Sequence, residues 1–209
     1  LEATLASLRA EPQLKPEERQ TVARLQRAFE LRTVRSLQRA GAYEAAAAKL
    51  DALLAADPED RALRVAQADL ALSRNQIRVA RDRYAALVAE DPDDLDTRLS
   101  YVRALTADRS RDLALAQLEY VIERAPAEDL ELQLGIARRQ LDLGSTEDAS
   151  RTLDGVLLRA PHRSDALVLA GRAKLAQRDF EGARAFFARA DAGTDTAASA
   201  QAREALLAL

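Results

Sequence analysis

LVAEDPDDLD, residues 87–96, nearly repeats LLAADPEDRA, residues 53–62. The shared DP pair belongs to a longer series of four prolines separated by 34, 34 and 35 positions: Pro58, Pro92, Pro126 and Pro161. A fixed period of this length indicates that one small structural unit is repeated along the chain. The repeated sequence therefore predicts a fold that is built from copies of this unit.

Three apolar positions precede each proline at constant offsets. An alanine stands twelve residues before it, a larger apolar residue eight before, and an aliphatic residue five before; the alanines are Ala46, Ala80, Ala114 and Ala149. Offsets of four and three place these residues on one face of a helix. The alanine marks the closest approach of a neighbouring helix, and the proline ends the helix.

A turn also precedes each of these helices, as in AGAYEAA at 40–46 and DLGSTEDA at 142–149. Gly41 and Gly144 stand where a helix ends with a positive φ angle, and Ser145 with Asp148 are expected to cap the next helix. Each unit is therefore a helix, a short turn, a second helix and a proline turn. At the amino terminus we expect a short helix over 1–11 and a continuous helix from Pro16 to Arg39.

This unit resembles the tetratricopeptide repeat, a pair of helices of about 34 residues. The resemblance implies an all-α fold, a right-handed superhelical solenoid of antiparallel helix pairs in which neighbouring units bury each other's apolar faces. We expect one solenoid over 1–209, with N-terminal helices in 1–26 and a terminal helix at 198–209. The five repeats are expected at 27–60, 61–94, 95–128, 129–163 and 164–197.

The composition restricts the function classes. The net charge of −3 provides no basic field for non-specific nucleic-acid binding. No apolar run approaches the roughly 18 residues of a membrane-spanning helix. The sequence does not begin with Met, so we expect it to be part of a longer or processed chain.

No pattern indicates catalysis. The chain has no cysteine and one histidine, His162, so the usual zinc sites and Cys–His catalysis are excluded. The carboxylates of EDPDD, residues 90–94, lie in one turn before a helix, where capping explains them. We predict no catalytic residue, no metal site and no cofactor, and therefore no enzyme.

The first helices of the repeats carry a recurrent arginine. One aligned position holds Arg35, Asp69, Arg103, Arg138 and Arg172, and a position one turn away holds Leu31, Val65, Leu99, Leu134 and Val168. The resemblance implies that these helices line a concave groove where partners dock. The predicted binding residues are Arg35, Arg103, Arg138, Arg172, Leu99 and Leu134. Alternatively, Asp96, Glu131 and Asp165 neutralise the arginines in exposed pairs.

A closer resemblance covers residues 14–60 and 67–94, with their long first helix, the GAYEAA turn and the DP turns. These stretches look like the periplasmic repeat region of the C protein of bacterial cellulose synthase; exporters of alginate, Pel and poly-N-acetylglucosamine carry similar solenoids. The resemblance implies a periplasmic, non-catalytic scaffold that links the synthase to the outer-membrane pore. It would bind protein segments of the secretion complex, or the passing glycan, and no nucleic acid.

Two alternatives remain open at this point. One is a general peptide-binding adaptor, cytoplasmic or periplasmic, that is unrelated to polysaccharide. The other is the regulatory arm of a larger enzyme. The absence of Trp disfavours a glycan-gripping surface, so protein contact is the better expectation.

Overall fold

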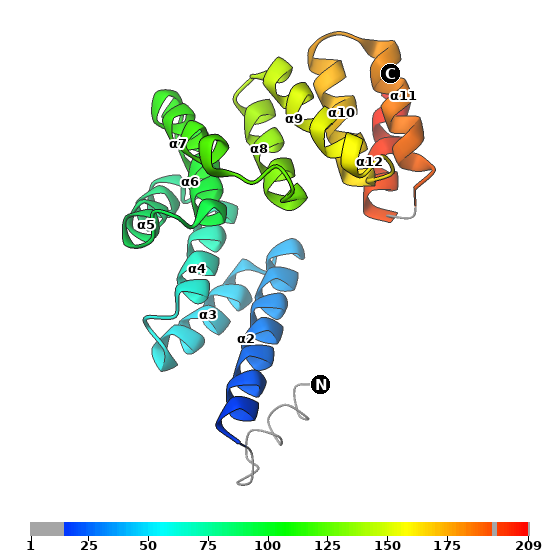
Figure 1. Ribbon diagram of the computed structural model, residues 1–209. Coiled ribbons are helices and arrows are strands. Elements are labelled where there is room, and N and C mark those ends of the chain that lie inside the picture. The colour runs from blue at the N-terminus through cyan, green and yellow to red at the C-terminus, as the bar shows by residue number, and fades with distance from the viewer. Residues whose placement is uncertain (1–14, 194–195, 209) are drawn as a thin grey trace. The chain divides into compact units, whose positions relative to one another are not determined.

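The computed structural model describes residues 15–193 and 196–208, and in these residues the protein consists of helices with no strand (Figure 1). The helices are α2 (Pro16–Arg39), α3 (Tyr43–Ala56), α4 (Arg61–Ser73), α5 (Ile77–Glu90), α6 (Leu95–Ala107), α7 (Arg111–Arg124), α8 (Leu130–Asp142), α9 (Thr146–Arg159), α10 (Ser164–Ala176), α11 (Phe180–Asp191) and α12 (Thr196–Leu207). The all-α prediction is confirmed, as is the continuous helix from Pro16 to Arg39. The helix expected over 1–11 lies outside the described residues.

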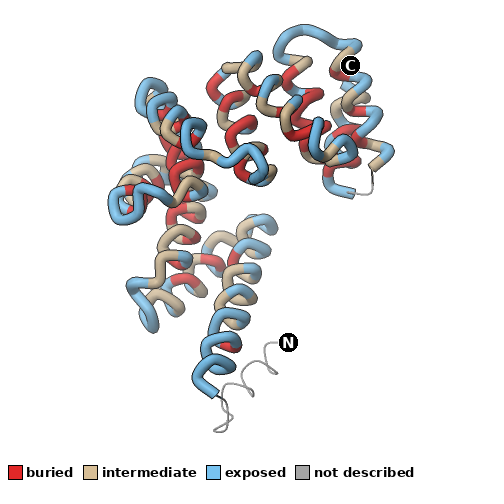
Figure 2. Tube along the Cα trace, viewed as in Figure 1, coloured by how far each residue is buried: buried red, intermediate tan, exposed pale blue. Residues whose placement is uncertain are grey.

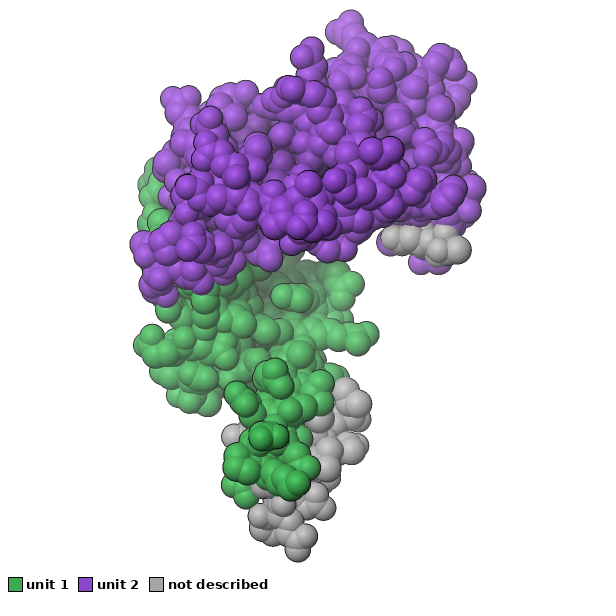
Figure 3. Space-filling view, viewed as in Figure 1, with its two compact units in different colours: residues 1–87 green, residues 88–209 purple. Residues whose placement is uncertain are grey.

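The chain forms two compact units, residues 1–87 and 88–209 (Figure 3). In the first unit α2 packs against α3 and α4, and α3 packs against α4. In the second unit α6, α8 and α10 lie in succession beside one another, and each packs against the helix that follows it in the chain. The helices from α4 to α11 begin and end in step with the predicted repeats, and the terminal helix begins at Thr196.

Aspartates of the proline turns begin the first helices of the repeats. Each side chain accepts a hydrogen bond from the backbone N–H three residues later: Asp60 from Leu63, Asp94 from Thr97 and Asp129 from Leu132, at 2.9–3.0 Å. This is the standard N-cap, which satisfies a backbone donor that the helix itself leaves unpaired. The expected cap at Ser145 is wrong: its side chain makes no cap hydrogen bond, and Asp148 instead pairs with Arg151.

The turn inside each repeat has a left-handed residue at the same place. Gly41 and Gly144 have φ of 73° and 77°, as predicted, and three residues with side chains adopt the same conformation: Asn75, Arg109 and Arg178, at 59–62°. Asparagine tolerates this region, whereas arginine is strained in it. Two of the five turns therefore store backbone strain.

Arg109→Gly is expected to stabilise the protein by about 0.5–1 kcal/mol, because relief of roughly 1–2 kcal/mol of left-handed strain exceeds the entropy that glycine loses on folding. Denaturant unfolding would measure the change. Gly144→Arg is the matched reverse substitution and is expected to destabilise by a similar amount. Equal stability of both variants and wild type would contradict this assignment of strain.

The core follows the predicted alanine column. Ala46, Ala80, Ala114, Ala149 and Ala183 are each 0% exposed. The larger residues four positions on are also buried: Leu50, Tyr84, Leu118, Leu153 and Phe187. The buried residues lie where paired helices face each other, and the outer faces are exposed (Figure 2). Small side chains at the contact let the helices pack closely, as the sequence predicted.

In the described part of the chain, no helix combines the length and the apolar character needed to cross a bilayer.

Candidate functional site

Three of the four predicted arginines come together in the second unit. Arg103 of α6, Arg138 of α8 and Arg172 of α10 are all exposed, and they lie on helices that stand side by side. Burial lowers the pKa of Arg139 most and these three positive charges lower it further, so all three lie near its guanidinium group. Arg35 is also exposed but belongs to the first unit.

Arg139 is the residue that the sequence reasoning missed. Burial lowers its pKa most, the carboxylate of Asp142 raises it, and the three neighbouring arginines lower it again. Its Nη1 atom lies 3.2 Å from Asp142 Oδ2. That buried atom makes no well-directed hydrogen bond among the described residues. We call Arg103, Arg138, Arg139 and Arg172 the arginine cluster; it holds four cations, and one carboxylate contacts Arg139.

The carboxylates that were expected to neutralise these arginines are engaged elsewhere. Glu131 and Asp165 both pair with Arg163, at 2.6 and 2.9 Å. The pKa of Asp96 is raised, first by burial and then by the negative charges of Asp94 and Asp129, so Asp96 lies among other acids.

The remaining electrostatic link is weak. Burial raises the pKa of Asp165, but the hydrogen bond and charge of Arg163, the backbone N–H of Ala166 and the more distant charge of Arg138 outweigh burial and lower it. Within the described chain, no ion pair joins Asp96, Glu131 or Asp165 to Arg138 or Arg172. The alternative of a neutralised, charge-paired surface therefore does not hold for Arg138 and Arg172.

The predicted apolar stripe is not available to a partner. Leu99 and Leu134 are 8% and 2% exposed, and Val168 is buried as well. Leu99 packs against α8 at Gly135, where an added Cβ would lie 2.7 Å from Leu99 Cδ1. Because Gly135 has no side chain, α8 approaches α6 closely and covers the leucine. Leu99 and Leu134 are thus core residues, and their assignment to the groove surface is wrong.

The other candidate groups occupy ordinary surface positions. His162 is exposed in the turn before α10. No group of three or more His, Cys, Asp or Glu residues with metal-binding geometry occurs in the described ranges. The arginine cluster therefore remains as the candidate site in the described ranges. Its guanidinium groups can hydrogen-bond carboxylate or phosphate oxygens in pairs.

Comparison with known proteins agrees with this architecture. The tetratricopeptide repeat family model matches residues 65–129 and 134–201, more than half of the chain. The chain therefore belongs to the tetratricopeptide-repeat family. No curated protein matches the sequence.

Solved structures share the fold at low sequence identity. A thermophilic tetratricopeptide-repeat protein of Thermus thermophilus, TTC0263, has a TM-score of 0.70 at 22% identity, over 86% of this chain and 98% of that one. YrrB, described as a tetratricopeptide-repeat protein with an unusual peptide-binding site, has 0.52 at 18% identity, over 84% and 90%. Yeast Tom70 has 0.63 at 18% identity, over 97% of this chain and 45% of that one.

These comparisons establish the class of protein. Tetratricopeptide-repeat domains bind protein segments and are generally non-catalytic scaffolds. The identities of 18–22% to the solved structures indicate the fold alone.

Proposed function

We propose that this protein is a non-catalytic adaptor that binds an acidic segment of a partner protein on the arginine cluster. The observation that carries the proposal is the convergence of the exposed Arg103, Arg138 and Arg172 around Arg139. Burial lowers the pKa of Arg139 most, and the positive charges of Arg103, Arg138 and Arg172 lower it further, so these three guanidinium groups add a repulsion to the cost of burial. A carboxylate-bearing ligand would remove that repulsion.

The partner's chemistry follows from the corrected geometry. With Leu99 and Leu134 buried, the surface around the cluster is polar, so recognition depends on Arg–carboxylate pairs rather than on apolar anchors. Hydrogen bonds to charged groups contribute about 1.5–3 kcal/mol each. Two or three Asp or Glu side chains, spaced to meet arginines on successive helices, would therefore suffice for binding.

A salt titration with synthetic peptides tests this proposal. A fluorescent peptide with several Asp and Glu residues is expected to bind the chain and to weaken steeply as NaCl rises, because salt screens exposed charges. The same peptide with Gln and Asn in place of the acids is the control and is expected not to bind. Equal binding of both peptides, or salt-independent binding, would refute the acidic-segment hypothesis.

We further propose, from the resemblance of residues 14–60 and 67–94 to the C protein of bacterial cellulose synthase, that the adaptor works in the periplasm within an exopolysaccharide secretion complex. The expected partner is then an acidic segment of another protein of that complex. Cell fractionation of the native source with an antibody to this chain tests the location. Recovery with the cytoplasmic fraction would refute the secretion role and leave the general adaptor.

A further inference from the structure

A second surface lies on the other layer of helices in unit 2. A groove of about 530 Å³ opens between α7 and α9, with Gln140 of α8 in its lining. The α7 wall is apolar: Leu115 and Ile122 are 37% and 45% exposed, and Leu118 lies beside them. This surface is separate in residues and in chemistry from the arginine cluster.

Beside this groove, α9 lacks a large side chain at one repeat position. The equivalent residue of α7 is Tyr120, whose hydroxyl lies 3.3 Å from Asp93 Oδ1 and whose ring stacks on Arg98 at 3.7 Å. The equivalent residue of α11 is Arg189, which donates to the carbonyl of Pro161 at 3.1 Å. Each of these side chains contacts the proline turn that precedes its own repeat.

In α9 this position is Gly155, and an added Cβ there would meet no atom within 4 Å. The repeat position three residues earlier also has a smaller side chain in α9, where Thr152 stands in place of the Phe186 of α11. As a result Ile122 is 45% exposed, whereas its equivalent Leu157, which shares a cluster with Phe186, is 9% exposed.

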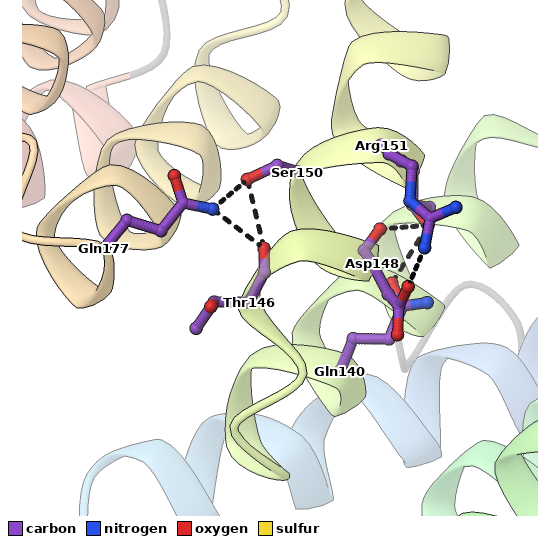
Figure 4. A network of polar contacts seen from close by, with 7 residues as sticks. Gln140, Thr146, Asp148, Ser150, Arg151 and Gln177 are labelled. Atoms are coloured by element: carbon purple, nitrogen blue, oxygen red, sulfur yellow. Dashed lines mark hydrogen bonds and ion pairs between the residues drawn. The ribbon is translucent and has the colours of Figure 1, made fainter.

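Several polar groups on the α9 wall are already paired within the chain (Figure 4). Arg151 pairs with Asp148, and Thr152 donates to Gln140 Oε1 at 2.9 Å. On the far side of α9, Gln177 donates to Ser150 Oγ at 3.0 Å and to the Thr146 carbonyl at 3.3 Å, which ties α9 to the next repeat. The α7 side of α9 is therefore the side that stays open to a ligand.

One charge on the apolar wall has no partner. Glu119 stands between Leu115 and Ile122 on the same face of α7 and makes no hydrogen bond or ion pair within the described chain. A ligand that covered this wall with apolar groups alone would bury that carboxylate at a large desolvation cost. A ligand that places a cation beside Glu119 avoids this cost.

The equivalent groove in the first unit, between α3 and α5, is different. Its volume is about 190 Å³, and Asp51, Arg74 and Arg83 contribute to its lining. The lining of the α7–α9 groove therefore differs from that of the equivalent groove in the first unit.

We propose that the α7–α9 groove binds an amphipathic helix of a partner protein, with a Leu or Ile stripe on Leu115 and Ile122 and a Lys or Arg facing Glu119. Leu115, Glu119 and Ile122 are spaced i, i+4 and i+7, so they present about two helical turns to a helix lying along the groove. Gly155, three residues after Thr152 on the same face of α9, leaves open space for that helix. Recognition of this kind uses apolar anchors at helical spacing.

Two designed peptides of about 14 residues test the proposal, one with a Leu stripe flanked by Lys and one with the same stripe flanked by Glu; two turns of contact need roughly this length. Fluorescence anisotropy is expected to show the Lys peptide binding about tenfold or more tightly than the Glu peptide, as for a single charge pair beside an apolar contact.

Gly155→Arg restores the residue type of α11 and places a long side chain on the face of α9 that carries Asp148 and Thr152, seven and three residues earlier. It is expected to weaken the Lys peptide by roughly tenfold or more, as loss of a central contact does. Its melting temperature should not fall, because the site has open space and arginine favours the helix over glycine. Leu158→Lys is the control: Leu158 is 82% exposed and outside the groove, so binding should be unchanged.

Failure of the Lys peptide to bind, unchanged binding by Gly155→Arg, or equal affinity for the Glu peptide would overturn the proposal. If Gly155→Arg fails to fold, Ile122→Lys blocks the same wall from α7 and decides the question. A wild-type dimer that Ile122→Lys dissociates in sedimentation would show that a second copy, not a partner helix, occupies the groove. None of these outcomes affects binding of the acidic peptide at the arginine cluster.

Discussion

Phe187→Ala is expected to lower the free energy of unfolding of unit 2 by about 3–5 kcal/mol, the usual loss for a buried phenylalanine. Phe187 is 0% exposed and belongs to a cluster with Leu153, Leu167 and Ala183. Its ring lies directly against Gly171 of α10, where an added Cβ would be 2.7 Å from Cδ1. The two helices meet at this ring, so its removal leaves a cavity that their backbones cannot close.

The same contact predicts the effect of enlarging the glycine. Gly171→Ala is expected to destabilise by about 1–3 kcal/mol, because a buried ring cannot move aside for the new methyl group. The smaller side chain in Phe187→Leu should recover part of this loss in the double variant. Urea unfolding of the four proteins measures the coupling.

Gly155→Ala is the matched control, since that Cβ meets nothing within 4 Å and alanine is the better helix former. It should be neutral or stabilising. If Gly171→Ala were as neutral or stabilising as Gly155→Ala, helix propensity would decide the result and the packing argument would fail.

Most of the fold could be predicted from the repeat period. Positions that recur in every unit, such as the buried alanines and the left-handed turn residues Gly41 and Gly144, were predictable because one physical requirement recurs at each of them. Their helices begin and end where the prolines and the capping aspartates indicate.

The site was only partly predictable, because alignment gives the face of a helix but not the distance to its neighbour. The position of Leu99 in the aligned repeats predicted that it lies on the groove surface. It is buried because Gly135 has no side chain, so α8 comes close enough to cover it. Arg139 lies one position outside the aligned column, so the periodicity could not select it. Its burial and its neighbours become visible only when α6, α8 and α10 stand together.

The groove shows the complementary case, because it depends on a departure from the repeat. Gly155 is unremarkable in a column that begins with Ala52 and Ala86. The effect of this glycine becomes clear only when it is compared with the equivalent residues Tyr120 and Arg189. Their side chains contact proline turns from the neighbouring helices α7 and α11. Irregular positions therefore needed the structure, whereas regular ones did not.

Charge reversal of Arg138 and Arg172 together to Glu is expected to weaken binding of the acidic peptide on the order of 100-fold or more, since each lost charge-assisted hydrogen bond contributes about 1.5–3 kcal/mol. Fluorescence anisotropy at fixed ionic strength measures the change. Stability should be nearly unaffected, because both side chains are exposed and neither forms an ion pair in the described chain. Reversal also removes two of the charges that lower the pKa of Arg139, so the melting temperature is expected to hold or rise slightly.

The control variant changes the net charge equally but elsewhere. Arg111→Glu with Arg184→Glu alters two exposed arginines of α7 and α11, and the acidic peptide should bind it nearly as well as wild type. If both double variants lost affinity to the same extent, binding would depend on net charge and the cluster would not be a site. If the Arg138 and Arg172 variant melted much earlier instead, these arginines would hold neighbouring repeats together. An unpaired cation is therefore evidence for a binding surface only when its removal costs affinity and leaves stability unchanged.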